Sequence, residues 1–143
     1  MSECTHDCST CGQNCGQRTE PESLLQKPHE QSHIKKVIGV CSGKGGVGKS
    51  MVTSLLAVTM QRMGLKVGIL DADITGPSIP REFGLKQKAE GNDTGIFPVR
   101  TTTGIDVMSL NLLLPNDSDP VAWRGPIIAG AVTQFWTDVL WGD

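Results

Sequence analysis

The feature of this sequence that most restricts its fold is the octapeptide from Gly43 to Ser50, which reads Gly-Lys-Gly-Gly-Val-Gly-Lys-Ser. It fits the pattern G-x-x-x-x-G-K-[ST], in which a run of backbone N–H groups wraps a polyphosphate. Its glycines permit the unusual dihedral angles that such a loop needs. Lys49 is then expected to reach the β- and γ-phosphates, and the Ser50 hydroxyl to bind Mg²⁺. The motif predicts a nucleotide-binding protein.

The flanking sequence has the order strand, glycine loop, helix that this motif requires. Residues 36–41 predict a short buried strand, and Met51 to Met63 predict a helix that ends at Gly64. A second apolar run, residues 66–70, predicts another strand. A strand, a helix and a strand in this order imply a right-handed crossover and a parallel sheet. We therefore predict the α/β class: a P-loop NTPase with a mostly parallel sheet flanked by helices.

Two carboxylates, Asp71 and Asp73, follow the second predicted strand directly. Ligands of open α/β sheets bind in the crevice beyond the carboxyl ends of the strands, so both side chains are expected beside the nucleotide. Asp93 and Asp106 stand in predicted turns, and we expect them to be solvated. Cys41 ends the first predicted strand and is expected to be a small core residue.

The rest of the chain predicts smaller elements and one long helix. A helical turn is expected at residues 79–83, a polar loop at 86–95, and a hairpin of strands 96–100 and 105–110 at the sheet margin. From Pro126 to Leu140, apolar residues at helical spacing predict a helix with a broad core-facing side. Because such a helix normally leads to a further strand, we expect this chain to be truncated, the amino-terminal part of a larger domain.

Composition bounds the setting of the chain. Its 143 residues suit one domain, and its net charge of −2 argues against nucleic acid as a partner. No stretch approaches the roughly 18 apolar residues that span a bilayer, and the start lacks the basic and apolar regions of a signal peptide. We therefore expect a cytoplasmic protein without a membrane partner, whose thiols stay reduced.

Four of the five cysteines, Cys4, Cys8, Cys11 and Cys15, crowd into the first sixteen residues with the spacing C-x3-C-x2-C-x3-C. In a reducing compartment this pattern predicts a metal module over residues 1–16. So compact a run of thiolates favours an iron–sulfur cluster, of 4Fe-4S type, over structural zinc or unliganded thiols, which stay open as alternatives. Residues 17–35 are polar and are expected to form a flexible linker to the P-loop domain at 36–143.

Three segments of the sequence resemble the Mrp/ApbC group of iron–sulfur cluster carrier ATPases, within the P-loop class that includes MinD, ParA and the nitrogenase iron protein. Gly39 to Ser50 is similar to the group's deviant Walker A motif, which carries an extra lysine at Lys44. Residues 71–80, Asp-Ala-Asp-Ile-Thr-Gly-Pro-Ser-Ile-Pro, resemble its first switch, and residues 123–126, Trp-Arg-Gly-Pro, a further signature. The switch is the most discriminating of these, since MinD and ParA proteins do not usually carry Thr-Gly-Pro-Ser there.

The resemblance implies a homodimer that sandwiches ATP and passes iron–sulfur clusters to recipient apoproteins. Lys44 would reach the partner's nucleotide, Asp73 would orient the attacking water, and Lys49 and Ser50 would keep the roles given above. The catalytic residues implied are thus Lys44, Lys49 and Asp73. The nucleotide-binding residues implied are Gly43, Lys44, Gly45, Gly46, Val47, Gly48, Lys49, Ser50 and Met51.

Three departures from the family pattern leave other functions open. Met51 stands where many relatives have threonine, which removes a hydroxyl contact to the α-phosphate. Some eukaryotic relatives also carry four cysteines at the amino terminus for a cluster, but their spacing is not C-x3-C-x2-C-x3-C. The family's second switch, Asp-x-Pro-Pro-Gly, and its Cys-Pro-x-Cys pair do not occur in these 143 residues. A MinD/ParA-like positioning ATPase and a non-enzymatic metal-binding fragment are therefore the alternatives.

Overall fold

The computed structural model describes residues 25–73, 76, 78–113 and 125–142. Its sheet has three strands in the order β1 (Gly68–Leu70), β5 (Asp106–Met108) and β4 (Val99–Arg100). β1 pairs with β5 in parallel and β4 with β5 antiparallel, so the sheet is mixed, with β5 at its centre. The expected α/β class with parallel pairing is confirmed. The expected position of the second hairpin strand at the sheet margin is wrong.

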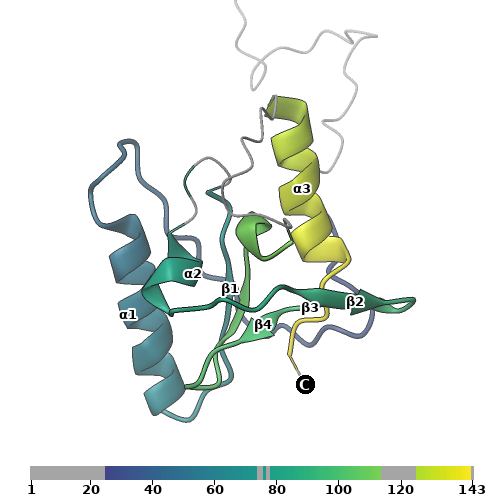
Figure 1. Ribbon diagram of the computed structural model, residues 1–143, viewed down its shortest axis with the longest axis horizontal. Helices are drawn as coiled ribbons and strands as arrows, with labels where there is room; N and C mark the ends of the chain where they lie inside the picture. Colours follow the sequence, from purple (N-terminus) through teal and green to yellow (C-terminus); the bar gives the residue numbers. More distant parts are fainter. Residues whose placement is uncertain (1–24, 74–75, 77, 114–124, 143) are drawn as a thin grey trace, which may run out of the picture.

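Helix α1 (Lys49–Arg62) covers one face of the sheet (Figure 1). It begins and ends within a residue or two of the sequence prediction. At its carboxyl end Gly64 takes a φ of 83°, its N–H bonds the carbonyl of Gln61, and the N–H of Leu65 bonds that of Met60. These are the two bonds of a Schellman motif, which only a residue that tolerates positive φ closes without strain.

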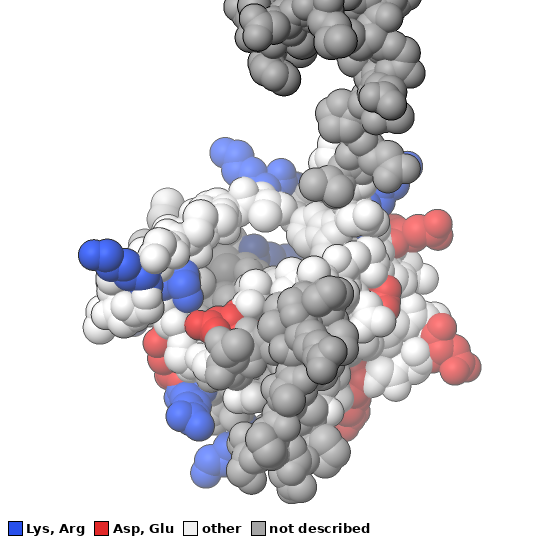
Figure 2. Space-filling view, turned by 90° about the horizontal axis from the view of Figure 1, so that it is seen from above, with Lys and Arg blue, Asp and Glu red and all other residues white. Residues whose placement is uncertain are grey.

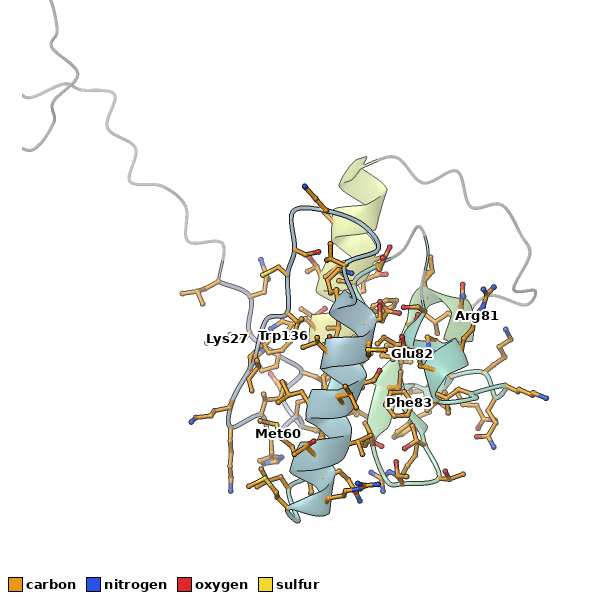
Figure 3. All side chains as sticks on the ribbon, turned by 90° about the vertical axis from the view of Figure 1, so that its left-hand side faces the viewer. Lys27, Met60, Arg81, Glu82, Phe83 and Trp136 are labelled. Carbon is orange, nitrogen blue, oxygen red and sulfur yellow. The ribbon has the colours of Figure 1, made fainter. Side chains whose placement is uncertain are left out.

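The short helix α2 (Ile79–Glu82) lies beside α1, and in Figure 3 its Glu82 and the following Phe83 lie against that helix. The Ser54 hydroxyl of α1 donates to the Glu82 carboxylate. Beneath both helices, a core of apolar side chains fixes them on the sheet, and its buried members are Ala57, Ile69, Ile79, Val99, Ile105, Val107 and Leu112. This core sets the end of α1 that carries the P-loop beside the carboxyl end of β1.

Helix α3 (Gly125–Thr137) lies on the other side of the sheet (Figure 1). Its predicted apolar side is buried at Ala131 and Phe135, and the buried Val139 and Trp141 follow it. Phe135, Val139 and Trp141 join Met108 and Leu110 in a second core, and a 3₁₀ turn begins at Leu110 (Leu110–Leu112). Beyond α3 the chain forms a parallel bridge between Val139 and Ile96.

The predicted polar loop at residues 86–95 is only partly a loop. Strand β2 (Glu90–Asn92) pairs antiparallel with β3 (Gly95–Phe97) to form a separate hairpin that projects from the body of the domain (Figure 1). Asn92 closes its turn, because its side-chain oxygen accepts the N–H groups of Thr94 and Gly95. All three residues of β2 are exposed, so the strand has no alternation of apolar and polar residues by which the sequence could predict it.

Residues 36–41 do not form the predicted buried strand. They have no strand assignment, and Val37 and Ile38 are 68% and 53% exposed. An apolar run predicts a buried strand only where neighbouring strands pair with it and layers cover it. Here β1 takes β5 as its parallel partner instead.

Residues 25–34, which we call the strap, make specific contacts with the carboxyl-terminal part of the domain. The Ser32 hydroxyl donates to the carbonyl of Val139 at 3.1 Å and accepts the N–H of Trp141 at 2.8 Å. The Trp136 indole N–H donates to the carbonyl of Gln26, where Figure 3 shows Trp136 beside Lys27. This half of the expected linker is therefore held against the fold. The expected cysteine module lies outside the described residues.

Candidate functional site

The P-loop forms an open backbone cradle at the start of α1. Gly46 and Gly48 take φ values of 73° and 89°, a region that favours glycine. No atom lies within 4 Å of the Cβ position at any of the loop's four glycines, so the loop is unobstructed. Gly48 is the N-cap of α1, which places the free N–H groups and the positive end of the helix dipole at the loop. The loop backbone is therefore open to an anion, with no side chain in the way.

A cavity of about 370 Å³ lies between the loop and the ends of the sheet strands. Its walls include Lys49 and Ser50 from α1 and Asp71 and Asp73 from the segment after β1. Figure 2, which looks down on this end of the molecule, shows both basic and acidic side chains, without one sign dominating the described surface. The predicted meeting of loop and carboxylates at one edge of the sheet is confirmed.

The Lys49 ammonium lies 3.7 Å from the Asp73 carboxylate. The other Asp73 oxygen accepts the N–H of Gly76 at 3.2 Å. Both partners of the ion pair keep about a third of their side-chain surface exposed, so a phosphate can compete with Asp73 for the lysine. The Ser50 hydroxyl is paired with that of Ser78, which brings a second hydroxyl to this wall.

Asp71 is buried, with 7% of its surface exposed. Its Oδ1 accepts the N–H of Asp73 at 3.0 Å, and its Oδ2 accepts the hydroxyl of Ser109 at 3.3 Å. Burial raises the pKa of the Asp71 carboxyl above its usual value, although these two hydrogen bonds oppose that effect. The site therefore contains two carboxylates in different surroundings, Asp71 enclosed and Asp73 facing the cavity.

Comparison with known proteins places this geometry in a family. Residues 33–143 match the family model ParA, described as NUBPL iron-transfer P-loop NTPase. The chain belongs to this ParA family. Among its relatives, an iron-sulfur cluster carrier protein of Methanocaldococcus jannaschii is 45% identical over 148 aligned residues, which cover 100% of this chain and 51% of that protein.

Two further matches agree with this assignment to the ParA family. An iron-sulfur cluster carrier protein of Clostridium perfringens is 51% identical over 119 residues, covering 78% of this chain and 42% of that protein. A solved structure of a nucleotide-binding protein from Archaeoglobus fulgidus, in complex with ADP, matches with a TM-score of 0.61 at 51% identity. That match covers 72% of this chain and 38% of the other. The chain spans about half the length of the curated relatives it matches.

The other predicted nucleotide-binding residues, 43–48 and Met51, do not line the cavity. Lys44 and Val47 are exposed on the loop, and the Lys44 carbonyl accepts the Ser42 hydroxyl at 2.9 Å. Met51, in the first turn of α1, is 63% exposed. Cys4, Cys8, Cys11 and Cys15 lie outside the described residues, as do Ile74, Thr75 and Pro77 of the switch. Ligation by these cysteines stays a prediction.

Two sequence expectations near the site are wrong. Cys41 is exposed and lines the cavity, because residues 36–41 do not form an inner strand. Asp106 is 9% exposed and not solvated, since it lies opposite Arg100 in the β4–β5 ladder and accepts two hydrogen bonds from it, at 2.7 and 2.9 Å. The sequence feature that could have predicted this ion pair is the short turn between two β-type runs. Such a turn places Arg100 and Asp106 opposite each other on adjacent strands.

Sequence reasoning also missed Ser78 and Ser109. Ser78 belongs to the switch segment that the sequence had marked, but its partner Ser50 is 28 positions away. Ser109 follows β5, and only the parallel register of β1 with β5 brings it to Asp71. A hydroxyl directly after a strand that neighbours the Asp71 strand is the signal that could have identified it.

Proposed function

We propose that the cavity between the P-loop and β1 binds ATP. The observation that carries this proposal is the convergence of Lys49, Ser50 and Asp73 on one cavity at the amino end of α1. The loop N–H groups and Lys49 would hold the phosphates, and nucleotide binding would draw Lys49 away from Asp73. The family supports this reading, as does the ADP named for the Archaeoglobus fulgidus protein.

The proposed reaction is ATP hydrolysis in a homodimer. Lys44 is exposed at the tip of the loop, where a partner's nucleotide could meet it, and Asp73 faces the cavity as the residue that orients water. The Ser50 hydroxyl, in the first turn of α1, would bind Mg²⁺, which prefers oxygen ligands. When bound, Mg²⁺ would offset negative charge on the phosphoryl oxygens.

The proposed cargo is an iron–sulfur cluster, which the protein would pass to recipient apoproteins in the cytoplasm. The relatives named iron-sulfur cluster carrier proteins support this function, and one of them aligns over the whole of this chain. A cytosolic Fe-S cluster assembly factor of Yarrowia lipolytica, 48% identical over 113 residues, supports the compartment. Cys4, Cys8, Cys11 and Cys15 are the proposed cluster ligands in this part of the protein.

Nucleotide binding and turnover test the first part of the proposal. Lys49→Ala should weaken ATP binding about tenfold to a hundredfold, as expected for the loss of a charge-assisted hydrogen bond. Lys44→Ala should leave binding nearly intact and lower kcat at least a hundredfold, because its charge would act on the transition state. Lys86→Ala, at an exposed lysine away from the cavity, is the matched control. Turnover unaffected by Lys44→Ala would contradict the dimeric mechanism.

Anaerobic reconstitution with iron and sulfide tests the cargo. The protein should develop a visible chromophore that Cys8→Ala or Cys11→Ala abolishes and that Cys41→Ala leaves intact. Transfer of that cluster to an apoprotein should then restore the recipient's own absorbance. Stoichiometric zinc with no bound iron after the same treatment would count against a cluster site.

A further inference from the structure

Three polar groups form a continuous hydrogen-bonded series from the interior of the sheet to the nucleotide cavity. Ser109 is fully buried with 0% exposure, Asp71 is 7% exposed, and Asp73 is half-buried in the cavity wall. The series ends at the Lys49 ammonium, 3.7 Å from Asp73. The series therefore links the end of β5 to the lysine of the P-loop. The link runs through Asp71 and Asp73.

The strand register places Ser109 and Asp71 together. Leu70 lies opposite Met108 in the parallel ladder, and the N–H of Asp71 donates to the carbonyl of Met108 at 2.9 Å. The residues that directly follow these two strands are thus adjacent. This adjacency is set by backbone pairing, so the position of the Ser109 hydroxyl is as rigid as the sheet.

The Asp71 carboxylate is held through both of its oxygens. Oδ2 accepts the Ser109 hydroxyl at 3.3 Å, and Oδ1 accepts the N–H of Asp73 at 3.0 Å. With one oxygen bound to the sheet, the carboxylate plane cannot turn freely, so the other oxygen stays directed at the Asp73 backbone. The carboxylate also accepts a backbone hydrogen bond from Ile79. Removal of the Ser109 hydroxyl would therefore loosen the carboxylate, which only backbone N–H groups would then hold, and leave a buried oxygen without this donor.

We infer that Ser109 is a positioning residue that acts through Asp71 to hold Asp73 in place beside the P-loop lysine. The inference rests on the proposed function only in treating Asp73 as the residue that orients water. Ser109 does not line the nucleotide cavity, whereas Asp71 lines it from an enclosed position. A misplacement of about 1 Å at a reacting centre costs about a hundredfold in rate, so a buried serine behind the site can control turnover.

The test compares Ser109→Ala with Thr101→Val in the 143-residue chain. Thr101 is 6% exposed, and its hydroxyl accepts the N–H of Ile105 at 2.9 Å, in the β4–β5 turn away from the switch segment. It is a matched control for the loss of a buried hydroxyl in the same sheet. The two readouts are the exchange rate of the Asp73 amide, measured by NMR without nucleotide, and the ATP kinetic constants.

Ser109→Ala should speed exchange at the Asp73 amide about fivefold, as expected for one weakened hydrogen bond. It should lower kcat by about tenfold or more while the ATP dissociation constant changes less than about twofold. Thr101→Val should leave both readouts at wild-type values. Equal Asp73 exchange in the two variants would overturn the inference.

Asp71→Asn separates positioning from a direct role of the charge and keeps the inference testable if Ser109→Ala fails to fold. The asparagine oxygen can still accept the Asp73 N–H, and its NH₂ group can donate to the Ser109 hydroxyl. Asp73 exchange within about twofold of wild type is expected, because the hydrogen bond to the Asp73 amide is kept without the charge. Fast Asp73 exchange in Asp71→Asn would overturn positioning as the role of Asp71. If wild-type protein shows no turnover, the proposed function fails, and Asp73 exchange alone still decides whether Ser109 positions it.

Discussion

Ser32→Ala should destabilise the whole domain, although Ser32 lies in a segment whose composition is that of a linker. Its hydroxyl makes two hydrogen bonds to the segment after α3: it donates to the Val139 carbonyl at 3.1 Å and accepts the Trp141 N–H at 2.8 Å. Both partners belong to buried residues of the second core. The strap is therefore expected to contribute to the free energy of unfolding.

The magnitude follows from those two bonds. Each intramolecular hydrogen bond contributes about 0.5–1.5 kcal/mol net, and a buried group left without its partner costs more. Ser32 is only half-buried, so water can partly replace the hydroxyl. We expect a loss of about 2 kcal/mol, which shifts a urea midpoint by about 1 M when the slope is about 2 kcal/mol per molar.

Urea unfolding followed by tryptophan fluorescence measures this shift, since Trp141 is buried and Trp136 contacts the strap. Thr133→Ala is the control. Its hydroxyl donates to the carbonyl of Ala129 in its own helix and is exposed, so its loss should be neutral or slightly stabilising. A Ser32→Ala midpoint equal to that of the control would refute the reasoning and make the strap a passive tether.

Three further outcomes are expected. Gly68→Ala should destabilise by about 1–3 kcal/mol in the same urea assay, because its Cβ would lie 2.8 Å from Cε3 of the Trp141 ring. Asp71 has a raised pKa in the folded state, so its contribution to stability is present at acid pH and is lost as pH rises through that pKa. Asp71→Asn should therefore remove part of the fall in unfolding free energy between acid and neutral pH, measured by denaturation at each pH. Arg100→Ala should cost about 1 kcal/mol, since its side chain is exposed while Asp106 is mostly buried, and high salt should reduce that cost.

The parts of the structure that the sequence predicts well are those with local causes. Helix α1 follows from apolar spacing and from Gly64, whose positive φ closes the last turn. The P-loop follows from its glycines, and the cavity follows from the rule that strand ends and loop share one edge of the sheet. The described residues contain no helix that is long and apolar enough to cross a bilayer.

The errors arise where a partner distant in sequence decides the outcome. Residues 36–41 have the composition of an inner strand, but Val37 and Ile38 remain exposed because β1 pairs with β5. Conversely, the polar composition of the strap predicts a free segment, yet Ser32 finds backbone partners more than a hundred positions away. The composition of a segment indicates whether its side chains favour a buried or an exposed position. Whether the segment is in fact buried depends on the segments that pair with it.

Ser109 and Asp73 show how this distinction bears on function. The place of Asp73 in the cavity wall could be found from sequence because it depends on one strand end, and the carboxyl ends of parallel strands open onto the same crevice. Ser109 depends on which strand is the neighbour of β1, and no local pattern specifies that choice. Once the β1–β5 register is known, the hydroxyl, the buried carboxylate and the cavity carboxylate fall into one series. Groups that act directly on a ligand are thus accessible to motif reasoning, while groups that hold them in position become visible only with the strand order.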